Sequence, residues 1–295
     1  MPRTKAEDTL AEAERLWLGG EEQRAREVYR RARLLFHEQQ DAFGEAAALT
    51  QLGDLEMRMG HHDAAQAAFV EARALLAPSA DQRDQGALLM RLAELAHRRH
   101  HAAEARQFYG AAREMMHSAG DLSGEAHALK RLGHLEREES RQDVAMEIYH
   151  AALALYRRAG DGLGEANTLR ALGGLHAALG EADIADESFR KAARLYGEAG
   201  DVLGEAAAGA GLGHLLLQVG DTDAAMRELE KAAALYATAG HLRGEADLLC
   251  DLAHLEIGSD RAGARRRLEH AARLYDQVGA ADLKEKAERE TRMLG

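Results

Sequence analysis

The sequence predicts an all-α protein, a right-handed superhelical solenoid of stacked helical hairpins. Three observations predict this fold class. The 295 residues carry an internal repeat, the apolar residues within each repeat follow the spacing of amphipathic helices, and only two prolines accompany abundant Ala, Leu, Glu and Arg. A single hairpin cannot cover its own apolar faces, so we expect the hairpins to stack on their neighbours and form one continuous core.

The period of the repeat is read from a string of eight residues that returns along the chain. It reads AGDLSGEA at 119, AGDGLGEA at 159, AGDVLGEA at 199 and AGHLRGEA at 239. Asp121 and Asp161 are 40 positions apart (161 − 121 = 40), and the same column continues back to Asp81 and Asp41. We therefore expect a single solenoid over residues 1–295, with repeats that start near residues 5, 41, 81, 121, 161, 201 and 241.

Each repeat contains two helices that are joined by a short turn. In the fourth repeat Ala145, Tyr149 and Ala152 are spaced by 4 and 3 residues, which places them on one stripe of a helix. Residues 126–135 form the apolar side of the helix before it, and ESRQD joins the two. After the seventh hairpin, residues 280–294 predict one more amphipathic helix, which caps the end of the array.

The glycines of the repeated string have two interpretations. Gly160, Gly162 and Gly164 lie within five positions, as in a loop that binds phosphate. Such a loop follows a β-strand, and no strand is predicted before these glycines. We expect instead that Gly160 ends one helix, that Asp161 caps the next, and that Gly164 allows the two helices to approach closely.

The columns of the repeat resemble those of the tetratricopeptide repeat family. A small residue in the first helix (Gly173), a turn glycine (Gly180), an alanine (Ala185) and an aromatic residue (Phe189) follow one another in the order typical of that family. The resemblance covers essentially the full chain. Each repeat is similar to the longer, 40-residue variant of the family's repeat. It implies a concave wall lined by the first helices and a non-catalytic role in binding a protein or peptide partner.

Composition excludes several classes of function. The net charge of −12 argues against a nucleic-acid binder, because that role needs a surplus of Lys and Arg. No apolar stretch approaches the ~20 residues of a membrane-spanning helix, and residues 1–20 lack the apolar centre of a secretory signal. The single cysteine, Cys250, cannot form an intrachain disulfide. We expect a cytoplasmic protein without a cofactor, and a homo-oligomer is compatible with this composition.

The resemblance places a peptide-binding groove on first-helix positions that vary between repeats. The candidate residues are Asp54, Arg91, Glu94, His127, Lys130, His134, Arg137, Asn167, Arg170, His214 and His254. Lys130 and Arg170 occupy one column in neighbouring repeats, and Arg91, Arg131 and Arg137 extend this basic cluster in an acidic chain. A basic groove attracts an acidic segment or a C-terminal carboxylate. The alternative, a polar face that is merely solvated, stays open.

Family members that clamp carboxylates carry Lys, Asn and Arg at comparable positions. This chain has Lys130, Asn167 and Arg170 there, but a histidine where those members have asparagine, so the same ligand is not implied. A second binding hypothesis places an apolar side chain against the small residues Ala207, Ala210 and Gly211 of the sixth repeat. A third interpretation is a regulatory or sensor array that controls a partner enzyme or transcription factor.

A hypothesis of another class is an enzyme or metal site centred on Cys250 and His254. The two lie four residues apart on one helix, near Asp247 and His214, and such groups can form a nucleophilic dyad or bind zinc. Cysteine is also a common small buried residue, and no oxyanion donor is predicted nearby, so we expect no catalytic residue and no metal. A turn cluster of four histidines could also bind a divalent metal, but we interpret it as an adventitious surface cluster; it consists of His61, His62, His100 and His101.

Overall fold

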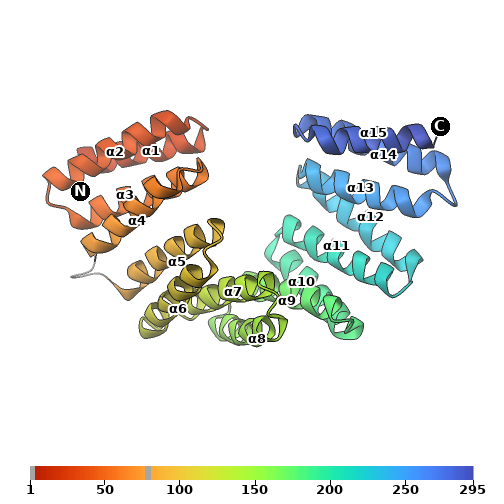
Figure 1. Cartoon of the computed structure of the whole chain (residues 1–295), viewed down its shortest axis with the longest axis horizontal. Coiled ribbons are helices and arrows are strands. Elements are labelled where there is room, and N and C mark those ends of the chain that lie inside the picture. Colours follow the sequence, from red (N-terminus) through yellow and green to blue (C-terminus); the bar gives the residue numbers. More distant parts are fainter. Residues whose placement is uncertain (1–3, 77–80, 295) are drawn as a thin grey trace. The chain divides into compact units, whose positions relative to one another are not determined.

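The structure is a computed structural model that describes residues 4–76 and 81–294 (Figure 1). Within these ranges the chain forms helices and turns, and no strand. The helices, in chain order, are α1 (Lys5–Leu18), α2 (Glu22–Glu38), α3 (Ala42–Arg58), α4 (His62–Leu76), α5 (Gln82–Arg98), α6 (Ala102–Ser118), α7 (Leu122–Glu138), α8 (Gln142–Ala159), α9 (Gly162–Ala178), α10 (Ala182–Ala199), α11 (Val202–Gln218), α12 (Thr222–Thr238), α13 (Leu242–Glu256), α14 (Arg261–Gln277) and α15 (Ala281–Met293). The all-α class is confirmed.

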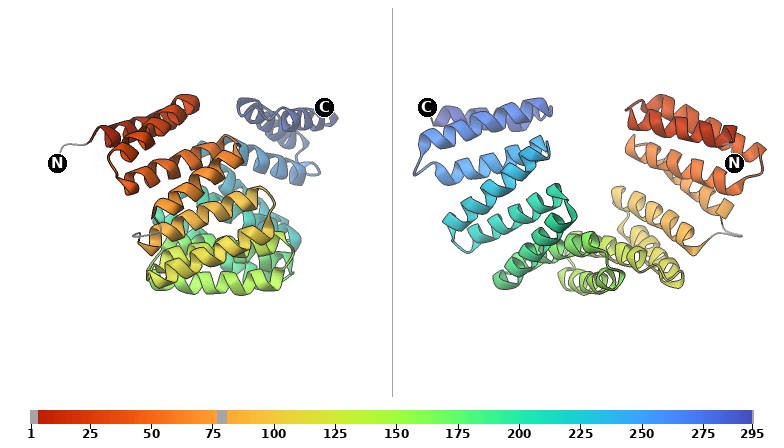
Figure 2. Two further views of the ribbon diagram at one scale, coloured as in Figure 1. Left: turned by 60° about the vertical axis from the view of Figure 1, so that its left-hand side comes forward. Right: turned by 180° about the vertical axis from the view of Figure 1, so that it is seen from behind.

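Consecutive helices form hairpins, from α1 and α2 to α13 and α14, and α15 follows the last hairpin. From α3 to α13 the first helices of the hairpins begin at residues 42, 82, 122, 162, 202 and 242, 40 residues apart. Two further views show that, within each of the two units given below, neighbouring hairpins are stacked side by side (Figure 2). No helix in the described ranges is both long and apolar enough to cross a membrane.

The chain divides into two compact units, one ending at Leu155 and one beginning at Tyr156. The first unit contains α1 to α7 and most of α8, and the second contains the end of α8 and all helices from α9 on. The single domain expected over residues 1–295 and the superhelical path of the whole chain stay predictions.

The repeated glycine string has the three roles that the sequence predicts. Gly160 ends α8 with a φ of 69°, a left-handed conformation that glycine adopts at low cost. The Asp161 side chain caps α9 by accepting a hydrogen bond from the amide of Gly164 at 2.7 Å. A Cβ on Gly164 would lie 2.2 Å from a ring carbon of Tyr156. The absence of a side chain at Gly164 therefore lets the Tyr156 ring pack against the helix.

The core of each repeat is formed by an aromatic column and two small-residue columns. Tyr149 is fully buried, and its ring packs on Gly133, where a Cβ would come within 2.6 Å. Two hairpins earlier, the ring of Phe69 packs in the same way on Gly53, where a Cβ would lie 2.4 Å from a ring carbon. The alanine column, represented by Ala152, is also inaccessible to solvent. This close packing sets the distance between the helices of a hairpin.

Buried glutamates near the ends of first helices bind both the preceding helix and the turn that follows. Glu136 is 3% exposed and accepts hydrogen bonds from Arg106 (2.6 Å) and from Arg141. Burial favours a higher pKa for Glu136, but the hydrogen bonds from both arginines outweigh it and hold the pKa below its ordinary value. Glu56 is bound in the same way by Arg26 at 2.6 Å and His61 at 2.8 Å. These contacts were not predicted from the sequence.

The helix α15 packs as the first helix of a further hairpin would pack. Ala287 is buried in the cluster formed by α13 and α14, as the predicted apolar face requires. With the offset of 39 residues in the last repeat, Glu288 and Arg292 stand where α13 has Leu249 and Ala253. Those two residues of α13 are buried in the core. The capping helix is therefore confirmed, with polar residues where a second helix would need apolar ones.

Candidate binding wall on the first helices

Two columns of the first helices define the candidate site, which we call the first-helix wall. The Asp54 column consists of residues 14, 54, 94, 134, 174, 214 and 254, and the Arg91 column consists of residues 51, 91, 131, 171, 211 and 251. A helix brings residues three and four apart to the same face, so both columns belong to one side of each first helix together with the column of Lys130 and Arg170.

In the first unit, side chains of these two columns pair between neighbouring repeats. Arg91 of α5 donates to both carboxylate oxygens of Asp54 of α3, at 2.9 and 3.0 Å. Arg131 of α7 pairs in the same way with Glu94 of α5. Burial raises the pKa of Asp54, and Arg91 opposes that rise. Arg91 and Arg131 are therefore already neutralised by the chain's own carboxylates, which corrects their expected role as free cations of a basic strip.

The second unit has the same kind of pair with the two roles exchanged: the basic side chain is in the Asp54 column and the acidic one is in the following repeat. The Nε2 atom of His214 lies 3.0 Å from Asp251, and that of His254 lies 2.9 Å from Glu290 of α15. In the described chain, five such pairs join a residue of the Asp54 column to the repeat that follows. The remaining pair, near the N-terminus, joins Gln51 to Glu14 at 2.6 Å. Most of these side chains are partly exposed, so each pair contributes little to stability and mainly fixes the wall.

The junction between α9 and α11 has no such pair, because Gly174 and Gly211 occupy the two positions. A Cβ on Gly174 would meet nothing within 4 Å, so this part of the wall is open. A Cβ on Gly211 would lie 2.5 Å from the ring of Phe189, so that glycine is needed for packing. The neighbouring residues of α11, Ala207 and Ala210, are also small. This junction therefore has an apolar surface of small residues, and neither the Asp54 column nor the Arg91 column places a carboxylate there.

Arg170 lies beside this open junction, four residues before Gly174 on α9. Its Nε atom is buried and forms no hydrogen bond with any residue that the structure describes. Burial raises the pKa values of Tyr196 and Tyr236. A side-chain hydrogen bond with Arg170 and the charge of Arg170 oppose the rise at Tyr196, and the charge alone opposes it at Tyr236. The guanidinium therefore lies near two tyrosine side chains, and within residues 4–76 and 81–294 it has no carboxylate partner such as Arg91 has in Asp54.

The other predicted groove residues are engaged to different degrees. The Asn167 side chain donates to the carbonyl of Leu163 in its own helix at 2.8 Å. His134 lies 2.8 Å from the hydroxyl of Tyr149, and neither His127 nor Lys130 is free of partners. Arg137 is exposed on α7. Lys130 belongs to the first unit and Arg170 to the second, so the groove that the sequence predicts between them stays a prediction.

Cys250 lines a cavity of about 280 Å³ formed by α13, α14 and α15 in the second unit. The hydroxyl of Tyr275 donates to Asp247 at 2.7 Å and lies 3.9 Å from the Cys250 sulfur. Burial raises the pKa of Cys250 to about 11, so the thiol is protonated at neutral pH. His254 lines the same cavity, but its Nε2 atom is bound to Glu290. The geometry does not assemble a thiolate nucleophile.

Neither candidate metal cluster gathers into a site. Among the residues that the structure describes, no group of three or more His, Cys, Asp or Glu side chains is placed to hold a metal ion. In the predicted turn cluster, His61 is bound to Glu56 at 2.8 Å and His101 lies 3.4 Å from Glu104. Near Cys250, His214 is directed to Asp251 instead. These histidines therefore have carboxylate partners of their own.

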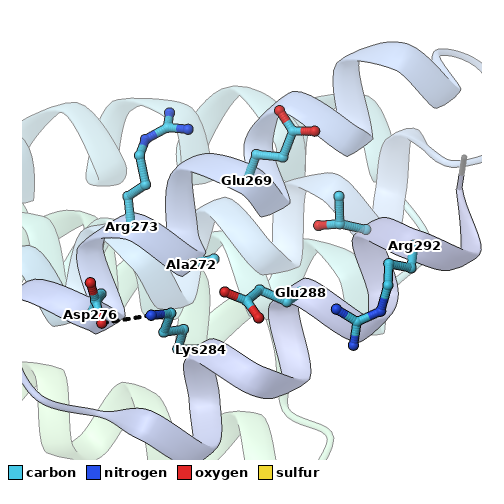
Figure 3. Close-up of a pocket in the computed structure, with 8 residues that line it drawn as sticks. Glu269, Ala272, Arg273, Asp276, Lys284, Glu288 and Arg292 are labelled. Carbon is cyan, nitrogen blue, oxygen red and sulfur yellow. Dashed lines mark hydrogen bonds and ion pairs between the residues drawn. The ribbon is translucent and has the colours of Figure 1, made fainter.

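A larger cavity, of about 470 Å³, lies between α14 and α15 (Figure 3). It is lined by charged side chains of both signs, including Arg273, Glu288 and Arg292, and an ion pair of 2.8 Å joins Lys284 to Asp276 at one end. It borders the polar side of α15, where a second helix would pack in a further hairpin. The mixture of charges defines no single ligand.

The sequence was compared with known protein families and curated proteins. Residues 210–238, which lie in α11 and α12, match the family model of the tetratricopeptide repeat. The match covers one hairpin, and it confirms the resemblance found in the sequence at that hairpin. No curated protein matches the sequence.

Solved structures share the fold at low sequence identity. BtubC (BKLC) from P. vanneervenii has a TM-score of 0.64 and 20% identity, over 81% of this chain and 93% of that one. A signal transduction ATPase with numerous domains and a tetratricopeptide repeat sensor, from Pyrococcus horikoshii, has a TM-score of 0.69 and 15% identity, over 90% of this chain and 43% of that one. A Rap protein in complex with competence and sporulation factor has a TM-score of 0.58 and 12% identity, over 98% and 97%.

Proposed function

We propose that this chain is a non-catalytic scaffold that binds an acidic segment of a protein or peptide partner on its first-helix wall. Arg170 receives the acidic group in the second unit. The observation that carries this proposal is the Arg170 side chain, whose buried Nε atom has no hydrogen-bond acceptor among the described residues. An unsatisfied buried N–H costs about 1–3 kcal/mol, and a carboxylate that reaches the guanidinium removes that cost.

The rest of the wall supports an acidic ligand at this place. Where a repeat carries Arg91 or Arg131, a carboxylate of the preceding repeat is bound to it. At the junction of α9 and α11 the corresponding positions are Gly174 and Gly211, so the chain supplies no carboxylate there. A partner's carboxylate would bind Arg170 as the chain's own carboxylates bind Arg91 and Arg131. The acidic chain repels such a ligand over most of its surface, which restricts it to this place.

The small residues of α11 give the ligand room beside Arg170. Ala207 and Ala210 have side chains of one carbon, and Gly174 has open space around it. A peptide backbone can therefore lie close to the helix while its acidic side chain or C-terminus turns to Arg170. The two binding hypotheses from the sequence, an acidic group and an apolar contact at α11, are in this proposal two parts of one site.

A second candidate function is a regulatory array that receives a signal and controls a partner protein. The similarity to a tetratricopeptide repeat sensor extends over 90% of this chain, and the similarity to the Rap protein bound to a factor extends over 98%. Both functions use the same wall, and they differ in what the bound partner does. Mass spectrometry of proteins captured from the source organism distinguishes them, because an enzyme or transcription factor among the partners favours regulation.

The proposal is tested by reversing the charge of Arg170 and measuring capture of the partner. Arg170→Glu is expected to abolish capture without changing the helical content, and salt is expected to weaken capture by the unmodified chain. The matched control is Arg190→Glu, because Arg190 lies on the next helix, α10, and forms an ion pair with Asp186 of that helix at 2.7 Å. Lys130→Glu tests whether the first unit contributes. Normal capture by the Arg170 variant would contradict the proposal.

A further inference from the structure

A groove of about 370 Å³ lies between the second helices α2 and α4 of the first unit, with α3 as its floor; we call it the second-helix groove. Leu49 and Leu52 of α3 form the floor, and both are buried. Leu34 of α2 lies on the rim with 60% of its surface exposed, and Ala68 of α4 lies on the opposite side. The lining is therefore mainly aliphatic.

This groove is distinct from the first-helix wall. Asp54, a wall residue, follows Leu52 by two positions, which is about 200° round the helix axis. The floor of the groove and the wall are thus on opposite sides of α3. A ligand in the second-helix groove does not compete with one on the wall, so the inference made here is independent of the proposed function.

The next repeat shows what kind of group fits this groove. Between α4 and α6 the corresponding space is reduced to about 10 Å³, and Leu92 and Phe108 line it. Phe108 stands 40 residues after Ala68, and Leu92 stands 40 residues after Leu52, so the two places are equivalent in the repeat (108 − 68 = 40 and 92 − 52 = 40). In one repeat the chain's own phenylalanine occupies the groove, and in the other an alanine leaves it open.

The charges at the rim indicate which residue accompanies the apolar group. Arg33 is bound to Glu71 across the groove and also contacts Glu45 at 3.3 Å. Arg30 on the same rim is about half exposed, and its one ion pair among the described residues is with Glu56, at 3.4 Å. Because Glu56 is already bound by other donors at shorter distances, Arg30 is the charge at the rim that is available to a ligand.

We propose that the second-helix groove binds a segment of a protein partner that inserts one phenylalanine side chain and places an acidic residue next to it. The phenylalanine takes the position that Phe108 has in the following repeat. The acidic residue meets Arg30 at the rim. The chain therefore has two separate binding surfaces, one on the first helices for an acidic group and one between second helices for an aromatic group.

The test uses fluorescein-labelled peptides of twelve residues that carry one phenylalanine flanked by aspartates in an Ala/Ser background, with fluorescence anisotropy as the readout. Replacing the phenylalanine by alanine is expected to weaken binding about 10- to 100-fold, because burial of that ring is lost. Equal binding of both peptides would overturn the proposal. Replacing the aspartates by asparagine is expected to weaken binding to the unmodified chain, and no change would overturn the acidic part of the proposal.

Variants of the full chain locate the binding. Ala68→Phe fills the groove as Phe108 fills its equivalent, so it is expected to abolish binding of the phenylalanine peptide while the chain still unfolds cooperatively. Leu34→Ala, at an exposed position, covers the case in which Ala68→Phe does not fold, and it is expected to weaken binding at least tenfold. Val144→Ala on α8 is the matched control at an exposed aliphatic residue.

Two further results would overturn the proposal. One is normal peptide binding by a folded Ala68→Phe variant or by Leu34→Ala. The other is a dimer in sedimentation experiments that Ala68→Phe dissociates, because a second copy of the chain would then occupy the groove. Binding that is lost in both groove variants and kept in the Val144 variant supports it.

Discussion

The junction of α3 with α5 and the junction of α9 with α11 have the same framework and different walls. At the first, Arg91 is bound by two hydrogen bonds to Asp54 of the preceding repeat. At the second, the same two positions are Gly174 and Gly211, and no pair forms. The comparison teaches that the core columns set the stacking of the hairpins, while the wall columns decide whether a junction is closed by the chain itself or open to a ligand.

The largest expected effect is on the alkylation rate of Cys250, which lies beside the closed junction of His254 with Glu290. Burial raises the pKa of its thiol from 9.0 to about 11, which lowers the thiolate fraction at neutral pH about 100-fold. Alkylation by iodoacetamide at pH 7.5 is therefore expected to be about 100-fold slower in the folded chain than in the chain unfolded in urea. Rapid alkylation of the folded chain would instead favour a reactive cysteine and the enzymatic hypothesis.

The next effect separates the two glycines of the open junction. Gly211→Ala places a methyl group 2.5 Å from the Phe189 ring, so it is expected to lower the free energy of unfolding. Overpacking of this kind costs about 1–3 kcal/mol, which urea unfolding measures readily. An unchanged free energy of unfolding would mean that the ring moves aside and that Gly211 is not required for packing.

Gly174→Ala is the matched substitution, and its expected effect is smaller and of opposite sign. The added methyl group meets nothing within 4 Å, and alanine is favoured over glycine inside a helix. The free energy of unfolding is expected to rise by about 0.5–1 kcal/mol. A decrease as large as that of Gly211→Ala would show that this part of the wall is filled in solution, contrary to the open junction.

The smallest effect is expected at the closed junction, for Asp54→Asn. Burial raises the pKa of Asp54 despite Arg91, so the folded chain holds this proton more tightly than the unfolded chain. The ionised carboxylate therefore opposes folding above its usual pKa, and this opposition disappears as the pH falls below it. We expect a change below about 1 kcal/mol at pH 7, because the pair is partly exposed.

Urea unfolding of both chains at pH 7 and pH 4 checks this sign. Relative to Asp54→Asn, the unmodified chain is expected to gain stability as the pH is lowered between these values. A relative loss over the same interval would mean that the bond to Arg91 outweighs burial, and that the closed junctions stabilise the fold.

The sequence was sufficient to predict the core because its columns are made of local patterns. The contact of Tyr149 with Gly133 and the helix cap at Asp161 each depend on residue types at fixed spacings within about one repeat. The sequence analysis predicted the hairpins and the capping helix from such patterns. It did not predict the bonds of Glu136, because an isolated glutamate in a helix gives no sign that it is buried.

The wall was harder to predict, because its contacts join different repeats. Arg91 was assigned to a basic strip, and its pairing with Asp54, 37 residues earlier, was not predicted. A signal for it exists: residues of opposite charge recur at this separation, as Glu94 and Arg131 do. The open groove beside Ala68 gives a weaker signal, a change in side-chain size within one column, and only the structure gives its volume.

The measurement that tests the central claim most directly compares one cation at the open junction with one at a closed junction. A labelled peptide derived from a captured partner is titrated against the unmodified chain, Arg170→Glu and Arg91→Glu, once with its acidic residues and once with the corresponding amides. We predict that Arg170→Glu and the amide peptide each weaken binding at least tenfold, while Arg91→Glu binds as the unmodified chain does. Equal losses in both variants, or none in Arg170→Glu, would contradict the claim that the open junction is the binding site.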